Sequence, residues 1–164
     1  WGFRLAHLTL GAFGIVAGGW ASNDVFPRIA ADVNGDGRAD LIGFGNSGVW
    51  VAFSDGWGFE APQLALGAFG VVAGGWANNN IFPRIAADRN GDGRADLIGF
   101  GNGGAWIAYS TGLGFTAPQL EINAFGVLAG NWMSDEASPR VAADMSGDGR
   151  ADIIGFGDAG VWIG

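Results

Sequence analysis

Apolar residues in this chain occur in short runs separated by glycine-rich or polar turns, and no stretch shows the 3.6-residue spacing of an amphipathic helix. Residues 62–69 alternate apolar and polar positions after an initial proline, which is typical of an edge strand. Residues 83–88 form a short run with two alanines, residues 95–101 are apolar on both faces, and residues 105–110 are apolar again. We therefore predict four short antiparallel strands in this part of the chain, joined by tight turns.

The same pattern occurs three times, in repeats that we assign to residues 1–56, 57–112 and 113–164 of one segment. Two columns of tryptophan mark the repeat at a spacing of 56 residues without insertion: Trp20, Trp76 and Trp132, and Trp50, Trp106 and Trp162. A four-stranded unit repeated at this length predicts an all-β fold, a β-propeller with three four-stranded blades per chain. The alternative is a β-solenoid, for which a coil of this length is long.

Residue size within the repeat indicates where its parts lie. The alanine pair Ala86-Ala87 and its counterparts suit the innermost strand, where neighbouring blades crowd the axis of a propeller. Trp106 and its counterparts lie in the middle of a strand, so we expect them in the core. The Trp76 column has two open interpretations, packing between blades or contact with a ligand.

The two ends of the chain have complementary patterns. Residues 5–13 read as an outer strand, whereas the last repeat ends after its third strand, at residues 161–164. Exposed strand edges favour pairing with another chain. We therefore expect the ring to be completed by oligomerisation with exchange of the N-terminal strand. A homodimer with six blades is favoured over a homotrimer with nine, because propellers typically have about four to eight blades.

An acidic nonapeptide, Asp32 to Asp40, returns in each repeat with its aspartates in place. Its side-chain oxygens occupy positions one, three, five and nine, and a backbone carbonyl is available at position seven. Such a set of hard oxygen ligands is what Ca²⁺ prefers, so we predict about one Ca²⁺ per repeat. The predicted ligands are Asp32, Asn34, Asp36, Arg38 and Asp40; Asp88, Asn90, Asp92, Arg94 and Asp96; and Asp144, Ser146, Asp148, Arg150 and Asp152.

Two other interpretations apply to this loop, an EF-hand and a hairpin turn without metal. An EF-hand needs a glutamate at its twelfth position, where this chain has Gly43, Gly99 and Gly155, and it needs flanking helices that the apolar runs do not predict. A hairpin turn that binds no metal stays open, because Asn-Gly and Asp-Gly are favoured turn pairs in any case.

Composition excludes several classes of function. The chain of 164 residues has a net charge of −8, no lysine and no basic patch, which argues against binding of nucleic acid. No apolar run approaches the roughly 18 residues of a membrane span. His7 is the only histidine, and cysteine is absent, so neither a Ser-His pair nor a cysteine nucleophile is available. We expect a protein that is not an enzyme.

Residues 69–101 combine the motifs FG, GGW, PR, DxNGDGxAD and GFG. In this combination the chain resembles the Psathyrella velutina lectin-like repeats and, more broadly, the FG-GAP/VCBS-type calcium-binding blades found also in integrin α-subunits. The resemblance implies a secreted, extracellular lectin that binds terminal N-acetylglucosamine, and in some members sialic acid, between blades. The repeats of the Psathyrella velutina lectin usually carry a histidine where this chain has Phe26, Phe82 and Ser138. The alternative function is an integrin-like adhesion or scaffold module without sugar binding.

Antiparallel strand order places the Trp76 connection and the Asn102 turn at the end of the blade opposite to the acidic loop. Tryptophan supplies an apolar plate for a sugar ring, and amide, carboxylate and guanidinium groups supply hydrogen bonds to its hydroxyls. For the arginines that follow proline at a strand start, Arg28, Arg84 and Arg140, a structural hydrogen-bonding role is at least as well supported as contact with a ligand. The predicted glycan-binding residues are Trp20, Asn23, Asp24, Arg28 and Asn46; Trp76, Asn79, Asn80, Arg84 and Asn102; and Trp132, Asp135, Glu136, Arg140 and Asp158.

Overall fold

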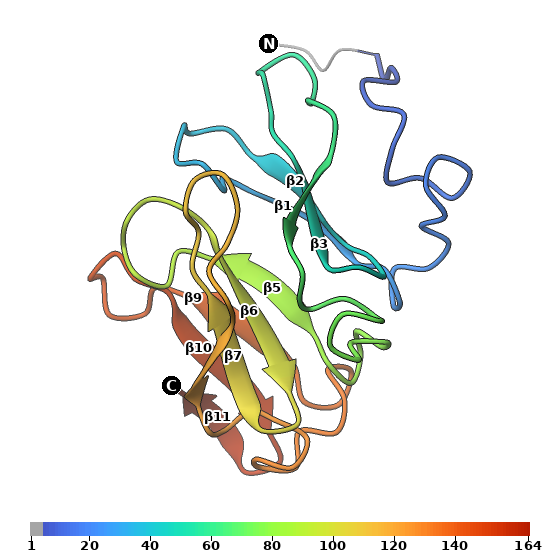
Figure 1. Cartoon of the computed structure of the whole chain (residues 1–164). Coiled ribbons are helices and arrows are strands. Elements are labelled where there is room, and N and C mark those ends of the chain that lie inside the picture. Colours follow the sequence, from blue (N-terminus) through green and yellow to red (C-terminus); the bar gives the residue numbers. More distant parts are fainter. Residues whose placement is uncertain (1–4) are drawn as a thin grey trace.

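The computed structural model describes residues 5–164 and shows three antiparallel sheets (Figure 1). The first sheet contains β1 (Arg28–Ala31), β2 (Asp40–Phe44), β3 (Val49–Ala52) and β4 (Gln63–Leu66). The second contains β5 (Arg84–Ala87), β6 (Asp96–Gly101), β7 (Gly104–Ala108) and β8 (Gln119–Ile122). The third contains β9 (Arg140–Ala143), β10 (Asp152–Gly157) and β11 (Gly160–Ile163). Within residues 5–164 there is no helix long and apolar enough to cross a membrane.

Each sheet is one blade of a β-propeller, as the repeat predicted. Strands β1, β5 and β9 are the inner strands, and it is these strands that contact one another between blades. Their small alanines allow this approach, in agreement with the prediction for the Ala86-Ala87 pair. The outer strand of each complete blade is contributed by the following repeat: β4 pairs with β3, and β8 with β7. The blades are therefore offset from the sequence repeats by one strand.

The hydrophobic core lies between the blades. One cluster joins Val33, Phe44 and Val51 of the first blade to Phe69 and Leu97, which belong to the second repeat. A second cluster joins Phe100 and Ile107 to Phe125, Trp132 and Ile153 of the third repeat. Because each blade completes its core with residues of its neighbour, the stability of a blade depends on the blades beside it.

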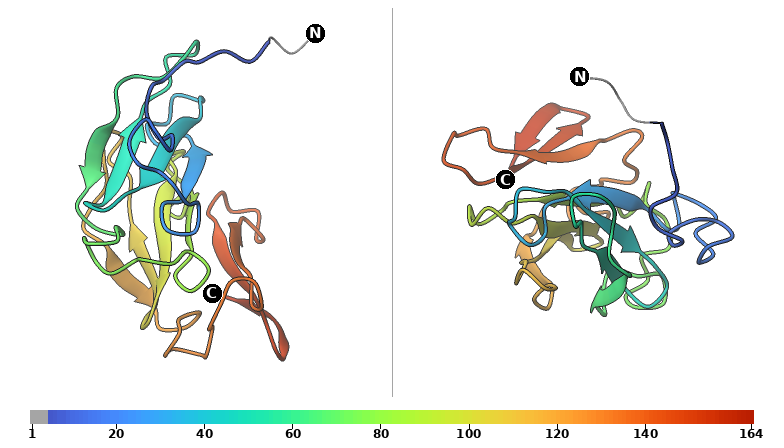
Figure 2. Two further views of the ribbon diagram at one scale, coloured as in Figure 1. Left: turned by 90° about the vertical axis from the view of Figure 1, so that its right-hand side faces the viewer. Right: turned by 90° about the horizontal axis from the view of Figure 1, so that it is seen from above.

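Residues 5–13, expected to form an outer strand by exchange with another copy, are not paired as a strand within the single chain, so the exchange stays a prediction. The side chains of Leu5 and Leu8 are 92% and 86% exposed. A strand needs neighbouring backbone groups to pair with. The sequence counterparts β4 and β8 obtain them from the preceding blade, and among residues 5–164 no such blade pairs with residues 5–13. Figure 2 shows this segment, drawn in dark blue, running outside the sheets.

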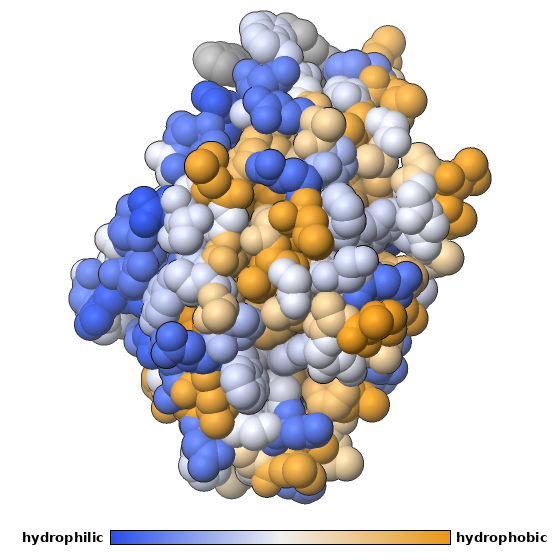
Figure 3. Space-filling model, in the orientation of Figure 1, coloured by the Kyte–Doolittle hydropathy of each residue, from blue (hydrophilic) through white to orange (hydrophobic). Residues whose placement is uncertain are grey.

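The two ends of the blades differ in character. Each of the three acidic loops joins the inner strand of a blade to the second strand of the same blade. The loops lie along one side of the molecule, and hydrophilic residues gather there in Figure 3. The long connections that precede the inner strands lie on the opposite side. This confirms the sequence prediction that the acidic loops and the Trp76 connection lie at opposite ends of a blade.

Candidate functional site

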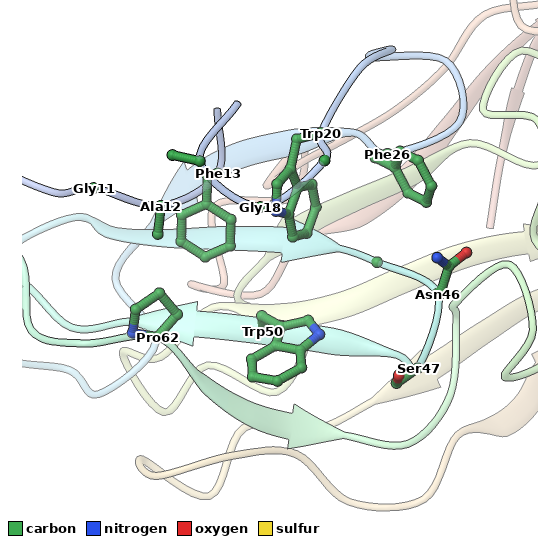
Figure 4. A pocket seen from close by; sticks show the side chains of 13 residues that line it. Gly11, Ala12, Phe13, Gly18, Trp20, Phe26, Asn46, Ser47, Trp50 and Pro62 are labelled. Atoms are coloured by element: carbon green, nitrogen blue, oxygen red, sulfur yellow. The ribbon is translucent and has the colours of Figure 1, made fainter. Parts of the chain in front are cut away.

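Three equivalent pockets occur, one on each blade. Each is formed by the long connection before the inner strand, the hairpin turn between the second and third strands, and a tryptophan on the third strand. Figure 4 shows the first pocket, with Phe13 and Trp20 above β2, Trp50 on the adjacent β3, and Asn46 and Ser47 at the turn that joins these strands. The cavity volumes are about 470, 440 and 300 Å³ for the first, second and third pockets.

The glycines of the GFG motif make room for the aromatic wall of each pocket. A Cβ atom added to Gly99 would lie 2.6 Å from Cε1 of Phe69 and 2.8 Å from Cη2 of Trp76, closer than any side chain tolerates. A Cβ atom on Gly101 would lie 3.1 Å from the indole nitrogen of Trp106. The motif therefore provides a flat strand surface on which two tryptophans of the same repeat meet.

A phenylalanine–tryptophan pair forms the upper wall. The ring centroids of Phe69 and Trp76 lie 4.9 Å apart at 82°, an edge-to-face contact that aromatic rings favour. Phe13 with Trp20 repeats this geometry, and Phe125 with Trp132 forms a more tilted pair. All three phenylalanines have a positive φ, 57° in Phe69, which is unfavourable for a residue with a side chain. Such strain persists only where surrounding contacts hold it.

The arginine after the proline supplies that contact. Nη1 of Arg84 donates to the carbonyl oxygen of Phe69 at 3.1 Å, and Arg28 and Arg140 do the same for Phe13 and Phe125. Arg84 is 2% exposed, and burial lowers its pKa to about 10, opposed by nearby Asp24. The arginines predicted to contact sugar therefore fix the aromatic wall from behind, and they line none of the three pockets.

The second tryptophan column was predicted to be core, and this holds only in part: Trp106 packs against the core cluster that contains Phe44 and Phe69, but no member of the column is fully buried. Trp50 and Trp106 are only partly buried, and Trp162 is 53% exposed. All three line the pockets. These are the site residues that the sequence argument missed. The signal was present in the glycines two residues apart on the neighbouring strand, which leave one face of the tryptophan uncovered.

The first tryptophan column combines both roles proposed from the sequence. Trp20 and Trp132 are 9% and 6% exposed, and both still line their pockets. Asn46, Asn102 and Asp158, predicted as glycan contacts, also line these pockets, at the hairpin turns. The structure thus brings together one tryptophan and one turn residue of each predicted set.

The remaining predicted contacts gather elsewhere. They form a separate shallow site at the axial rim, lined by Asn23, Asp24, Asn79, Asn80, Asp135 and Glu136. Their main role here is to join the blades. The carboxylate of Asp24 accepts the backbone N–H of Asn80 at 3.0 Å, and the side-chain amide oxygen of Asn80 accepts that of Glu136 at 2.8 Å.

The acidic loops are closed by their own backbone. The carboxylate of Asp32 accepts N–H groups of Gly35, Asp36 and Gly37, and that of Asp36 accepts the guanidinium of Arg38. In the third loop, the N–H groups of Gly149 and Gly147 hold the pKa of Asp144 below its usual range.

The ninth-position aspartates are used differently. Asp40 is fully buried, and its two carboxylate oxygens accept the N–H groups of Val33 and Ser54. Burial raises the pKa of its counterpart Asp96, opposed by the N–H groups of Ser110 and Arg89. Across residues 5–164, no three acidic or histidine side chains gather closely enough to hold a metal ion. Calcium binding by the loops stays a prediction.

Comparison with known proteins places this site in context. A family model described as FG-GAP-like repeat matches residues 88–155. A solved structure of an Agrocybe aegerita lectin that recognises non-reducing terminal N-acetylglucosamine is 41% identical, with a TM-score of 0.89, over 96% of this chain and 39% of that one. A structure of TcdB2-TccC3, 22% identical with a TM-score of 0.65, covers 87% of this chain and 6% of that one, and shares the fold. No curated protein matches.

These matches agree with the predicted propeller fold and with FG-GAP-like repeats, and they contain a lectin rather than an enzyme. The likeness to the Psathyrella velutina lectin in particular stays a prediction. The chain spans about two fifths of the Agrocybe lectin, 39% of its length.

Proposed function

We propose that the chain is a lectin that binds glycans ending in N-acetylglucosamine, at the three pockets formed by the two tryptophan columns. The observation that carries the proposal is the pair of tryptophans on a glycine floor, with a polar turn residue at one end. Trp76 and Trp106 offer apolar surface to the C–H face of a sugar ring, and Asn102 offers an amide to its hydroxyl or acetamide groups. The similarity to a lectin specific for this sugar supports the assignment.

The site is shallow and open, so a single pocket contacts few ligand atoms. We expect a dissociation constant of about millimolar to micromolar for the monosaccharide. Three pockets on one chain allow a branched or clustered glycan to bind several at once, which raises the apparent affinity without new contacts. The alternative function, an adhesion or scaffold module without sugar binding, predicts no retention on immobilised N-acetylglucosamine.

Titration calorimetry with N-acetylglucosamine oligomers tests the proposal. Trp106→Ala is expected to abolish binding at the second pocket and to reduce the measured number of sites. Trp57→Ala is the matched control, since Trp57 is 78% exposed and lines none of the three pockets. If the unaltered chain binds no N-acetylhexosamine or sialylated glycan, or if both variants lose binding equally, the assignment of these pockets is wrong.

Calcium is proposed separately, on the strength of the threefold oxygen spacing in the acidic loops. Asp32, Asn34 and Asp36 are the residues that would hold the ion, because all three are at least partly exposed, whereas Asp40 is fully buried. A ligand that binds only the folded state raises the melting temperature. Melting in excess Ca²⁺ and in EDTA should therefore differ, and Asp36→Asn should remove part of the difference. Identical melts, with no heat of Ca²⁺ binding, would refute the proposal.

A further inference from the structure

Three pairs of asparagine followed by glycine occur in the chain: Asn34-Gly35, Asn90-Gly91 and Asn102-Gly103. Such a pair contains the two groups of a spontaneous reaction. The backbone nitrogen of the glycine can attack the side-chain carbonyl carbon of the asparagine, and glycine hinders this attack least because it has no side chain. The chemistry is the same in all three pairs, so the fold decides which of them reacts.

In the two pairs that lie in acidic loops, the attacking nitrogen is engaged. The N–H of Gly35 donates to Oδ1 of Asp32 at 2.7 Å, and the N–H of Gly91 donates to Oδ1 of Asp88 at 2.7 Å. Hydrogen bonds to a carboxylate are stronger than those between neutral groups. The nitrogen must lose its proton before it attacks, so these bonds oppose the reaction.

The side-chain amides of the same two pairs are held as well. Oδ1 of Asn90 accepts the N–H of Asp92, and Nδ2 of Asn90 donates to Oδ2 of Asp92, both at 3.0 Å. Asn34 makes the same two bonds to Asp36. Either asparagine would have to break both bonds to reach the nitrogen that follows it. The acidic loops therefore protect their asparagines.

The third pair forms the hairpin turn between β6 and β7, and its reacting groups are not engaged. Asn102 is exposed, and among residues 5–164 neither its side-chain amide nor the N–H of Gly103 has a hydrogen-bond partner. A Cβ atom added to Gly103 would meet only Cδ2 of Leu120, at 3.7 Å, so the turn is open. Figure 4 shows the equivalent turn of the first blade, with Asn46 at its tip.

One restraint acts on this turn. The carbonyl oxygen of Asn102 accepts the N–H groups of Leu128 and Ala129, at 3.0 and 3.2 Å. These bonds hold the peptide that links Asn102 to Gly103, and this peptide must rotate for the nitrogen to reach the side chain. We therefore expect the turn to react more slowly than an unfolded chain and faster than the two acidic loops.

We propose that Asn102 is a site of spontaneous deamidation, which changes the second sugar pocket. The nitrogen of Gly103 forms a bond to Cγ of Asn102, the side-chain nitrogen leaves as ammonia, and a cyclic succinimide results. Water then adds to one of the two carbonyl carbons of the ring, which opens to aspartate or to isoaspartate. In sum, water is consumed and ammonia is released, so no oxidant or reductant is required.

The modification places a carboxylate where Asn102 lines the second pocket. Aspartate gives this pocket the charge that Asp158 gives the third. Isoaspartate also adds a carbon atom to the backbone of the turn, which displaces the carbonyl group bonded to Leu128 and Ala129. Naming this pocket a sugar site rests on the proposed function, whereas the deamidation itself does not.

Peptide mapping by mass spectrometry tests the deamidation. The folded chain is incubated at neutral pH with EDTA, so that bound cations do not contribute to protection of the loops. Position 102 should be modified at least about tenfold faster than positions 34 and 90, because each loop must first break a hydrogen bond to a charged group. In concentrated urea the three pairs should react at similar rates. If position 102 of the folded chain reacts no faster than the loops, the proposal is overturned.

Gly103→Ala is the matched variant for the mechanism. The methyl group hinders attack by the backbone nitrogen, and the structure has room for it at this position. The variant should therefore fold, and its Asn102 should be modified several-fold more slowly. An unchanged rate would show that the reaction does not proceed through the nitrogen of residue 103.

Titration calorimetry of fresh and aged protein with N-acetylglucosamine oligomers separates the two proposals. The number of sites should fall in proportion to the isoaspartate found at position 102. Gly103→Ala, compared before and after the same ageing, should lose fewer sites. If position 102 is modified and all sites persist, the effect on the pocket is wrong although the deamidation stands. If fresh protein binds no oligomer, the proposed function is wrong, and the peptide map alone decides the deamidation.

Discussion

The second and third blades have nearly the same sequence pattern and very different environments. Ile107 on β7 is 1% exposed, and Ile163 at the same position on β11 is 59% exposed. The difference does not come from the residues, since both are isoleucine. It arises because the second blade has a neighbour on each face and the third has one. Burial in this protein is a property of adjacency between repeats, as in other repeat architectures.

The largest expected effect on stability comes from truncating the side chains of these two isoleucines to alanine. Ile107→Ala should destabilise the chain by about 2–5 kcal/mol, because it leaves a cavity in a closed core. Ile163→Ala should cost the isolated chain only about 0.5 kcal/mol, as for an exposed position. Urea unfolding measures both. Equal losses under conditions where the chain is monomeric would show that the third blade is covered within one chain.

The next comparison concerns the arginines. Arg84→Met removes the donor to the carbonyl of Phe69 and should cost about 1–3 kcal/mol, the penalty for a buried acceptor without a partner. It should also weaken sugar binding at the second pocket, because Phe69 and Trp76 lose their alignment. Arg28→Met is the control in the half-buried first repeat and should cost less. If Arg84→Met lowers stability but leaves sugar affinity unchanged, the arginine does not position the aromatic wall.

The turn residue distinguishes the pockets by charge. The second pocket carries Asn102, and the third carries Asp158, whose carboxylate would repel the carboxylate of a bound sialic acid. A pair of like charges about 4 Å apart in water costs roughly 1 kcal/mol, or about fivefold in affinity. Asn102→Asp should therefore weaken binding of sialylated glycans at the second pocket, with little effect on neutral ones. A glycan array of both proteins reads this out, and a parallel loss for neutral glycans would contradict it.

The smallest effect is a pH dependence of one turn. The N–H groups of Trp57 and Gly58 hold the pKa of Asp55 below its ordinary value of 3.8. Its contribution to stability is thus present above pH 3.8 and is lost as pH falls through the lowered value. The equivalent turn in the next repeat has Thr111, which does not titrate. In a plot of melting temperature against pH, Asp55→Asn should slightly reduce the decrease on the acid side, and Thr111→Val should leave it unchanged.

Much of the fold was predictable because the repeat shows the same pattern three times. Strands, turns, blade order and the placement of the two loop types followed from alternation, glycine and the period. The site was predictable only in part. Trp76 and Asn102 were identified from their place at one end of the blade, but Trp106 was assigned to the core, because a tryptophan in mid-strand is usually buried.

The sequence by itself determined the repeating unit: its strands, its glycine floor and the residues that recur at each pocket. Only the tertiary structure decided which of these residues face solvent. Arg84 is buried behind the aromatic wall because Phe44 of another repeat lies beneath it, and Trp106 is open because Gly99 and Gly101 beside it carry no side chains. These outcomes depend on contacts between residues far apart in the chain, and no local pattern specifies them.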